Sequence, residues 1–161
     1  MKISDILKKE NLGPAQAIST TLYSGFFPIA PGTVGAAVAC FFLWVLPEIP
    51  PLFLLLLTLV FFFVGVWAAG RAEQIWQEKD PGRINWDEFV GMMTSVLFLP
   101  KSWMLLLMAF FVFRVFDVVK PYPVNRAEKI KSGWGIMLDD IYAGIYTNIL
   151  MQIIFRWSGL L

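Results

Sequence analysis

The sequence of 161 residues contains no histidine and only one cysteine. Without histidine the chain has no imidazole base, no imidazole metal ligand and no route to a phosphohistidine intermediate. Cys40 has no second cysteine for a disulfide and lies inside an apolar run, so we expect a buried structural residue rather than a reactive thiol. Any chemistry must therefore use carboxylates, hydroxyls, basic side chains or a bound cation.

Charged residues are also scarce. They make up 16% of the chain, whereas 58% is hydrophobic and the mean hydropathy is +0.67. This apolar share is above that of ordinary soluble domains and predicts an integral membrane protein. The net charge of +1 argues against the broad basic surface that nucleic-acid binding requires, so no nucleic-acid partner is expected. The length fits a single compact domain over residues 1–161.

Apolar runs separated by proline and glycine predict an all-α fold, because unpaired backbone is too costly in lipid and no run alternates like a barrel strand. The clearest run, Leu52–Ala69, is uncharged and long enough to cross a bilayer. The other predicted helices are Val34–Leu46, Trp86–Leu99, Trp103–Val119 and Ile136–Phe155. Together they predict a compact bundle of about four to five membrane-embedded helices. Met1–Leu12 predicts an additional N-terminal surface helix.

Basic residues gather on one side of this predicted bundle. Only Lys101 and Arg156 fall on the other side when successive helices alternate in direction. The rich side collects Lys2, Lys8, Lys9, Arg71, Lys79, Arg83, Arg114, Lys120, Arg126, Lys129 and Lys131. By the positive-inside rule, the rich side is cytoplasmic.

Five carboxylates lie in three short clusters on the same predicted side: Asp87 and Glu88, Asp117, and Asp139 and Asp140. Ionised groups in so apolar a chain are costly unless they are paired or coordinated. Gly91 and Gly144 each follow an acidic pair by about one turn, and such small residues let helices approach closely. Two helix ends brought together in this way would surround a hard cation such as Mg²⁺ with Asp87, Glu88, Asp139 and Asp140.

Plainer interpretations of these acids stay open at this stage. Asp87 and Asp139 could be helix N-caps, with Glu88 and Asp140 complementing the helix dipoles. Asp117 lies three residues after Arg114, which is the spacing of a simple helical salt bridge.

A second group of residues has the composition of a phosphate site. The turn over 25–35 is stiffened by prolines and leads directly into an apolar helix. The N-terminus of this helix, at Pro31, Gly32 and Thr33, would offer a phosphate free backbone donors and a positive dipole end. The alternative is an ordinary helix start with Thr33 as the cap. Arg114 and Lys120 could hold a phosphate or face anionic headgroups.

These residues stand in an order that resembles the bacterial phosphatidylglycerophosphatase A family. The motifs cover nearly the whole chain after about Ala15, and two positions, Asn85 and Ser132, differ from the family's usual pattern. The matching segments are Pro28–Gly35, Asp80–Pro81 with Trp86–Gly91, Phe113–Pro123 and Gly135–Gly144.

The resemblance implies a small enzyme of the bacterial inner membrane that removes the terminal phosphate of phosphatidylglycerophosphate with Mg²⁺. The active site would face the cytoplasm. In that interpretation Arg114, Lys120 and the Pro31–Thr33 turn bind the phosphate, and Asp139 or Asp140 accepts a proton from an attacking water. Asp117 is a further catalytic candidate. An aspartyl-phosphate intermediate is the alternative mechanism.

Two other classes of protein could use the same residues. An ion-coupled transporter would also place carboxylates in apolar helices, although closer to the middle of the bilayer. A non-enzymatic lipid-binding scaffold would use the basic face, but it has no need for acids on three separate helices.

Overall fold

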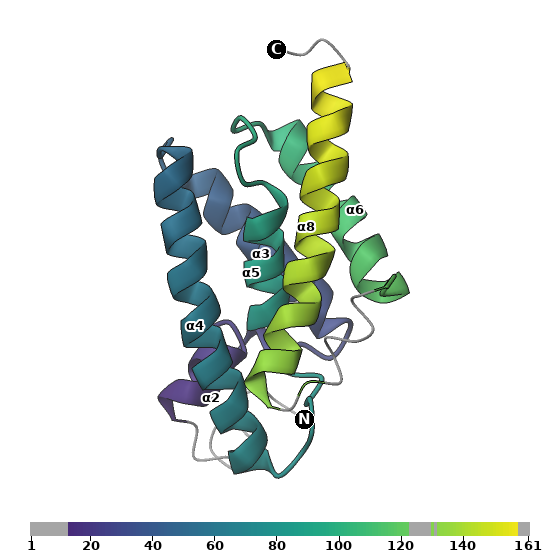
Figure 1. Ribbon diagram of the computed structural model, residues 1–161. Helices are drawn as coiled ribbons and strands as arrows, with labels where there is room; N and C mark the ends of the chain where they lie inside the picture. Colours follow the sequence, from purple (N-terminus) through teal and green to yellow (C-terminus); the bar gives the residue numbers. More distant parts are fainter. Residues whose placement is uncertain (1–12, 123–129, 131, 158–161) are drawn as a thin grey trace.

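The computed structural model describes residues 13–122, 130 and 132–157. These residues form six α-helices, one 3-10 turn and no strand (Figure 1), so the all-α prediction is confirmed for the part of the chain described. The predicted surface helix Met1–Leu12 lies outside these residues. The elements are α2 Pro14–Ser19, η1 Ser24–Phe26, α3 Pro31–Val45, α4 Pro51–Trp76, α5 Trp86–Ser95, α6 Trp103–Val119 and α8 Gly133–Trp157.

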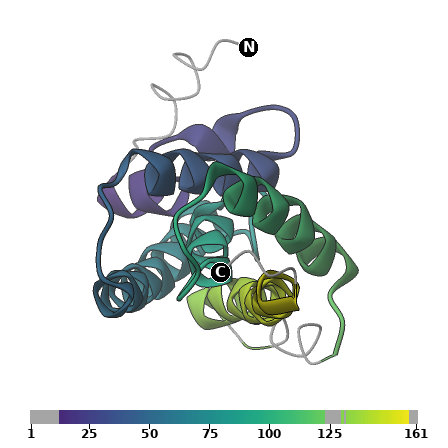
Figure 2. The ribbon, with the colours of Figure 1, turned by 90° about the horizontal axis from the view of Figure 1, so that it is seen from above.

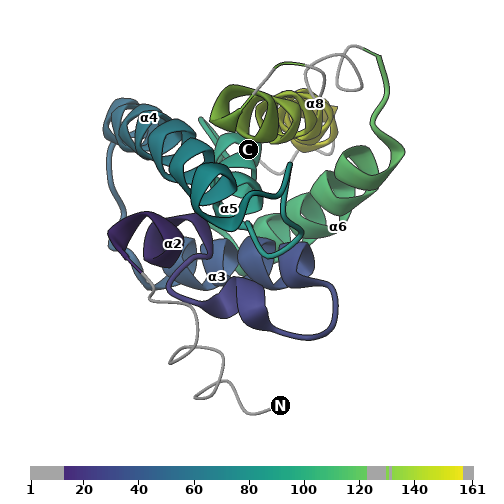
Figure 3. The same ribbon diagram turned by 90° about the horizontal axis from the view of Figure 1, so that it is seen from below.

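The short helix α5 lies at the centre of the bundle. It contacts α2, α3, α4, α6 and α8, and the views along the bundle show it enclosed by the longer helices (Figures 2 and 3). Every residue from Phe89 to Ser95 is buried, and Val90, Met92 and Met93 have no exposed surface. Because α5 is covered on all sides, the polar residues of its first turn can lie inside the protein without leaving the helix.

Glycines bring α8 unusually close to its neighbours. A Cβ at Gly144 would lie 2.5 Å from the carbonyl oxygen of Gly91, and one at Gly91 would lie 2.8 Å from that of Asp140. At the start of α8, a Cβ at Gly133 would lie 2.1 Å from the carbonyl oxygen of Val66 in α4. Real Cβ atoms cannot fit at such distances, so these glycines permit the α5–α8 and α4–α8 contacts.

Four helices differ in their bounds from the predictions, and one of them, α8, extends past the predicted Ile136–Phe155 at both ends, to Gly133 and Trp157. Helix α4 continues seven residues past Ala69 to Trp76, because Ala72 is buried with Ile84 and Ile136 in a small apolar cluster. Helix α5 ends at Ser95 rather than Leu99, where the Asn148 amide donates to the Ser95 carbonyl at 3.1 Å and to that of Leu97 at 2.8 Å. Helix α3 spans Pro31–Val45 rather than the predicted Val34–Leu46. Among the described helices, only α6 has the predicted bounds.

Among the described helices, α4 is the one that is both long and apolar enough to cross a membrane by itself. Its most apolar window has a mean hydropathy of 2.7, and only 28% of that window is buried inside the protein. Helices α3, α5 and α6 have 15, 10 and 17 residues. The embedding of the whole bundle therefore stays a prediction.

Candidate metal and phosphate site

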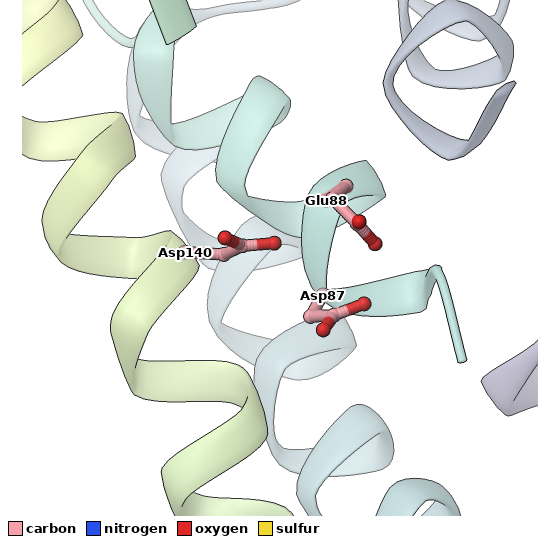
Figure 4. Close-up of side chains that lie close together, drawn as sticks. All are labelled: Asp87, Glu88 and Asp140. Atoms are coloured by element: carbon pink, nitrogen blue, oxygen red, sulfur yellow. The ribbon is translucent and has the colours of Figure 1, made fainter. Parts of the chain in front are cut away.

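Three carboxylates from two helices converge at one end of α5. Asp87 and Glu88 lie in the first turn of α5, and Asp140 points toward them from α8 (Figure 4). One oxygen from each of the three groups lies within 4.8 Å of the others. We call Asp87, Glu88 and Asp140 the acid cluster. The Gly91–Gly144 contact holds the two helices at the separation that this cluster needs.

Each carboxylate of the acid cluster has one buried oxygen without a hydrogen-bond partner. Asp87 Oδ1, Glu88 Oε2 and Asp140 Oδ2 are buried and have no hydrogen-bond partner. Burial raises the pKa of Asp87 to about 6, and it raises the pKa of Glu88 well above its usual range, with the Asp87 charge adding to the effect. Unpaired, converging carboxylate oxygens are the donor set that a hard divalent cation prefers, so the cluster could bind a metal ion.

One face of the acid cluster meets a basic side chain. Arg114 of α6 forms an ion pair with Asp117, and its Nη1 lies 3.7 Å from Glu88 Oε1. The predicted Arg114–Asp117 salt bridge is therefore present, and it also reaches the acid cluster. Asp117 fixes the guanidinium beside Glu88, where its remaining N–H groups can bind an anion.

The start of α3 lies against the same carboxylate. A Cβ at Gly32 would lie 1.8 Å from Glu88 Oε1 and 3.2 Å from Arg114 Nη1. The interpretation of Thr33 as the helix cap is wrong, because the N-cap is Ala30, at φ 47°, and Thr33 is already in the third helical position. The amides of Gly32 and Thr33 have no partner within the helix and so remain available to an anion.

The Asp139 side chain contacts Lys120, whereas that of its neighbour Asp140 lies in the acid cluster. Its Oδ2 accepts a hydrogen bond from Lys120 Nζ at 2.9 Å, and its Oδ1 accepts one from the Asp140 amide at 3.0 Å. The N-cap alternatives are wrong for both helices: Asn85 caps α5, and Asp139 is the seventh residue of α8. Asp139 also lines a polar pocket of about 210 Å³ together with Glu73, Lys79 and Asp80.

The geometry arranges the residues that the sequence singled out for metal or phosphate around two centres, which are linked through the neighbouring Asp139 and Asp140 of α8. One is the acid cluster with Arg114 and Gly32, and the other is the Lys120–Asp139 pair at the polar pocket. Residues 17–155 match the phosphatidylglycerophosphatase A family. The chain belongs to this family.

Curated relatives agree with the family match. A Phosphatidylglycerophosphatase A from Haemophilus influenzae is 34% identical over 94% of this chain and 95% of its own length, and one from Escherichia coli is 32% identical over 94% and 88%. A Bacteroides thetaiotaomicron protein, provisionally named phosphatidylinositol-3-phosphatase, is 40% identical over 87% of this chain and 92% of its own length. No solved structure matches the chain significantly.

Membership of the phosphatidylglycerophosphatase A family makes the chain a phosphatase. The prediction of an enzyme is thereby confirmed, and a purely structural scaffold is excluded. No relative in the comparison supports the transporter alternative.

The structure adds Asn85, which the sequence marked only as atypical for the phosphatidylglycerophosphatase A family. It is fully buried, and its amide donates to Ser24 Oγ at 3.0 Å and to the Pro31 carbonyl at 3.1 Å. A Cβ at Gly35 would lie 2.4 Å from the Asn85 carbonyl oxygen. Asn85 therefore fixes the start of α3 against the start of α5. The signal available in the sequence was a polar residue two positions before an acidic pair.

Asn85→Ala is expected to lower the free energy of unfolding by about 2 kcal/mol, because it removes two buried hydrogen bonds. Thermal unfolding in detergent measures this loss. Asn148→Ala is the matched control, since Asn148 makes two similar bonds at the other end of α5. We expect both variants to lose similar stability, and only Asn85→Ala to lose activity at temperatures where both remain folded. Equal activity losses would contradict the positioning role of Asn85.

Proposed function

We propose that this chain hydrolyses the terminal phosphomonoester of phosphatidylglycerophosphate, giving phosphatidylglycerol and inorganic phosphate. The observation that supports this most directly is the placement of Arg114 and the start of α3 beside an acid cluster with unpaired oxygens. The Haemophilus influenzae and Escherichia coli relatives are named for this activity. We propose that residues 1–161 form one domain around this site.

Mg²⁺ is the proposed cofactor, and Asp87, Glu88 and Asp140 are the residues that would hold it. Their all-oxygen donor set suits this ion, and their unpaired buried oxygens fit a bound cation. When bound, the ion would neutralise charge on the phosphoryl group. The sequence also predicted Asp139 as a metal ligand, but both Asp139 oxygens already accept hydrogen bonds.

Arg114, Lys120 and the amides of Gly32 and Thr33 are proposed to bind the phosphate oxygens. Positioning and charge stabilisation account for most of the catalysis in phosphoryl transfer. Asp117 holds the Arg114 guanidinium in place rather than touching the phosphate. Lys120 contacts Asp139 at 2.9 Å, so it can share its N–H donors between that carboxylate and a phosphate.

Asp139 is the proposed general base. Its Oδ2 takes a proton from a water whose oxygen bonds to phosphorus as the bond from phosphorus to the glycerol oxygen breaks. Asp139 then returns this proton to the departing glycerol oxygen, which balances the reaction. The polar pocket beside Asp139 gives room for water and the leaving headgroup. Trapping of an aspartyl-phosphate would overturn this mechanism.

We further propose that the bundle lies in the bacterial inner membrane with the site toward the cytoplasm. Large apolar side chains are exposed along the outside of α4, including Leu52, Phe53, Leu56, Leu59, Val60 and Phe63. Such a continuous apolar surface is unusual for a protein surrounded by water. Arg71 lies in the last turns of α4, Lys79 and Arg83 follow its end, and Lys79 lines the polar pocket with Asp139. Lys101 contacts the Leu46 carbonyl at the opposite end of the bundle. This asymmetry supports the proposed orientation.

The decisive experiment is phosphate release from defined lipids in detergent micelles. We expect turnover of phosphatidylglycerophosphate with Mg²⁺ and loss of turnover in excess chelator. Phosphatidylinositol 3-phosphate is the second candidate substrate, because the Bacteroides thetaiotaomicron relative is provisionally named for it. A higher kcat/KM for this lipid than for phosphatidylglycerophosphate would replace the proposed substrate, and no release from either lipid would contradict the proposal.

The affinity for a divalent ion is expected to fall with falling pH. Burial raises the pKa of Asp87 to about 6, so this carboxyl is ionised above that pH and increasingly protonated below it. Because a metal ligand must be deprotonated, the Kd for Mn²⁺ should rise by about tenfold per pH unit below pH 6 for each proton displaced. Paramagnetic resonance titrations of Mn²⁺ measure this dependence.

The Asp87→Asn variant is the control for the pH dependence. It should bind Mn²⁺ more weakly than the wild type but with a shallower dependence on pH, because one titrating ligand is gone. A wild-type Kd that stays constant across this range would show that the buried carboxyls do not hold the ion.

A further inference from the structure

An apolar groove lies between α3 and α6, outside the acid cluster. Its volume is about 400 Å³, and its wall on α3 is formed by Ala37, Cys40, Phe41 and Trp44. These residues recur every three or four positions, so they occupy one face of the helix. One turn before Ala37 the same face reaches Thr33 in the first turn of α3, next in sequence to Gly32, which packs against Glu88 Oε1.

The opposite wall of the groove also leads to the site. On α6 it includes Trp103, Leu107 and Phe110, again at helical spacing. The next position on this face, four residues after Phe110, is Arg114, whose guanidinium lies 3.7 Å from Glu88. Four helical residues rise about 6 Å, so the groove begins roughly one turn from the proposed phosphate site. Helices α3 and α6 lie side by side in both views along the bundle (Figures 2 and 3).

We propose that this groove is an acyl-chain subsite, which holds one fatty-acyl chain of the lipid whose phosphate lies at Arg114 and the start of α3. The inference rests on the proposed function and extends it to the other end of the substrate. The two helices would thus bind both parts of an amphiphile, with polar groups at the site and apolar side chains along the groove.

The chemistry of the groove favours an acyl chain over other occupants. Phe41 is 68% exposed and Leu107 is 49% exposed, so the groove opens sideways on apolar walls, as entry from a bilayer requires. The buried Leu106 lies at the floor, the small Ala37 leaves room beside it, and no charged group lines the groove. Its continuity with Arg114 ties the occupant to an anionic headgroup, which an annular lipid would not need.

Photolabelling tests the position of the chain without requiring turnover. The probe is a phosphatidic acid with a diazirine in one acyl chain, and the reference is a phosphatidylcholine with the same chain. We expect the phosphatidic acid to label residues 37–44 and 103–110 more strongly than the reference does, and unlabelled phosphatidic acid to remove the excess. Equal labelling of the groove by both lipids would show annular lipid only and overturn the proposal.

A groove-filling variant tests the effect on catalysis. Ala37→Trp should raise KM for a long-chain lipid substrate by about tenfold, the equivalent of about two buried methylenes, with little change in kcat. A dihexanoyl substrate should be affected less than twofold, on the order of experimental error. Leu56→Trp on the exposed face of α4 is the matched control and should leave both values unchanged.

The two experiments separate this inference from the proposed function. If the wild type releases no phosphate from any lipid, the proposed function fails, and photolabelling alone decides whether the groove binds acyl chains in a headgroup-dependent way. If the wild type is active but Ala37→Trp has an unchanged KM for long-chain lipid, the acyl-chain subsite is wrong while the proposed function stands.

Discussion

Glu88→Gln is expected to lower kcat/KM by at least about a hundredfold, which is typical for the loss of a group that stabilises charge in an active site. The substitution keeps the size of the side chain and removes its charge. One oxygen of Glu88 is buried without a hydrogen-bond partner, and the other lies 3.7 Å from Arg114. The variant would therefore lose affinity for a divalent ion, and Arg114 would lose the negative charge that lies beside its guanidinium. Phosphate release and Mn²⁺ titration measure the two effects.

The same substitution should raise the melting temperature when no divalent ion is present. The three carboxylates of the acid cluster lie within 4.8 Å of one another, and removal of one charge relieves both repulsion and the cost of burial. In the presence of Mg²⁺ the order should reverse, because only the wild type gains stability from binding.

Glu48→Gln is the matched control, since Glu48 is exposed and lies in the loop between α3 and α4, at the opposite end from the acid cluster. We expect it to match the wild type in activity, metal affinity and melting temperature. If Glu88→Gln behaves in the same way as Glu48→Gln, the acid cluster has no role in the reaction.

Sequence reasoning predicted the elements of the fold best where the chain itself marks their ends. The bounds of α6 follow from the Pro100–Ser102 turn before it and from Lys120–Pro121 after it. The end of α5 was missed because it depends on Asn148, which lies more than 50 residues later in α8 and binds the last carbonyls of α5. The extension of α4 likewise depends on tertiary packing of Ala72, which the polar residues around it concealed.

The acid pairs show why the site could be predicted only in part. The sequence indicated that α5 and α8 meet through Gly91 and Gly144, and this contact is present. It could not tell which acid of the second pair faces α5, because adjacent helical residues point about 100° apart and the register of α8 was unknown. The structure directs Asp140 into the acid cluster and Asp139 toward Lys120.

Gly32→Ala is expected to lower kcat/KM by about a hundredfold while leaving the fold intact, because the clash displaces a group that stabilises charge in the site. The new methyl group would lie 1.8 Å from Glu88 Oε1, so Glu88 must turn away from the acid cluster. The atom that moves is the end of a flexible side chain rather than backbone, so the cost in stability is small. Alanine also has a higher helix propensity than glycine, which offsets part of that cost.

The comparison with Gly82→Ala makes this prediction specific to the site. Gly82 has no heavy atom within 4 Å of the position that a Cβ would occupy, so the same chemical change there should alter neither activity nor Mn²⁺ affinity. Circular dichroism and melting temperature should be alike for both variants. Activity lost in Gly32→Ala with unchanged Mn²⁺ affinity would assign Gly32 to the phosphate alone, and full activity would separate the start of α3 from the reaction altogether. We expect Gly32→Ala to lose both activity and Mn²⁺ affinity, because the added methyl group displaces Glu88 and thereby disrupts the acid cluster.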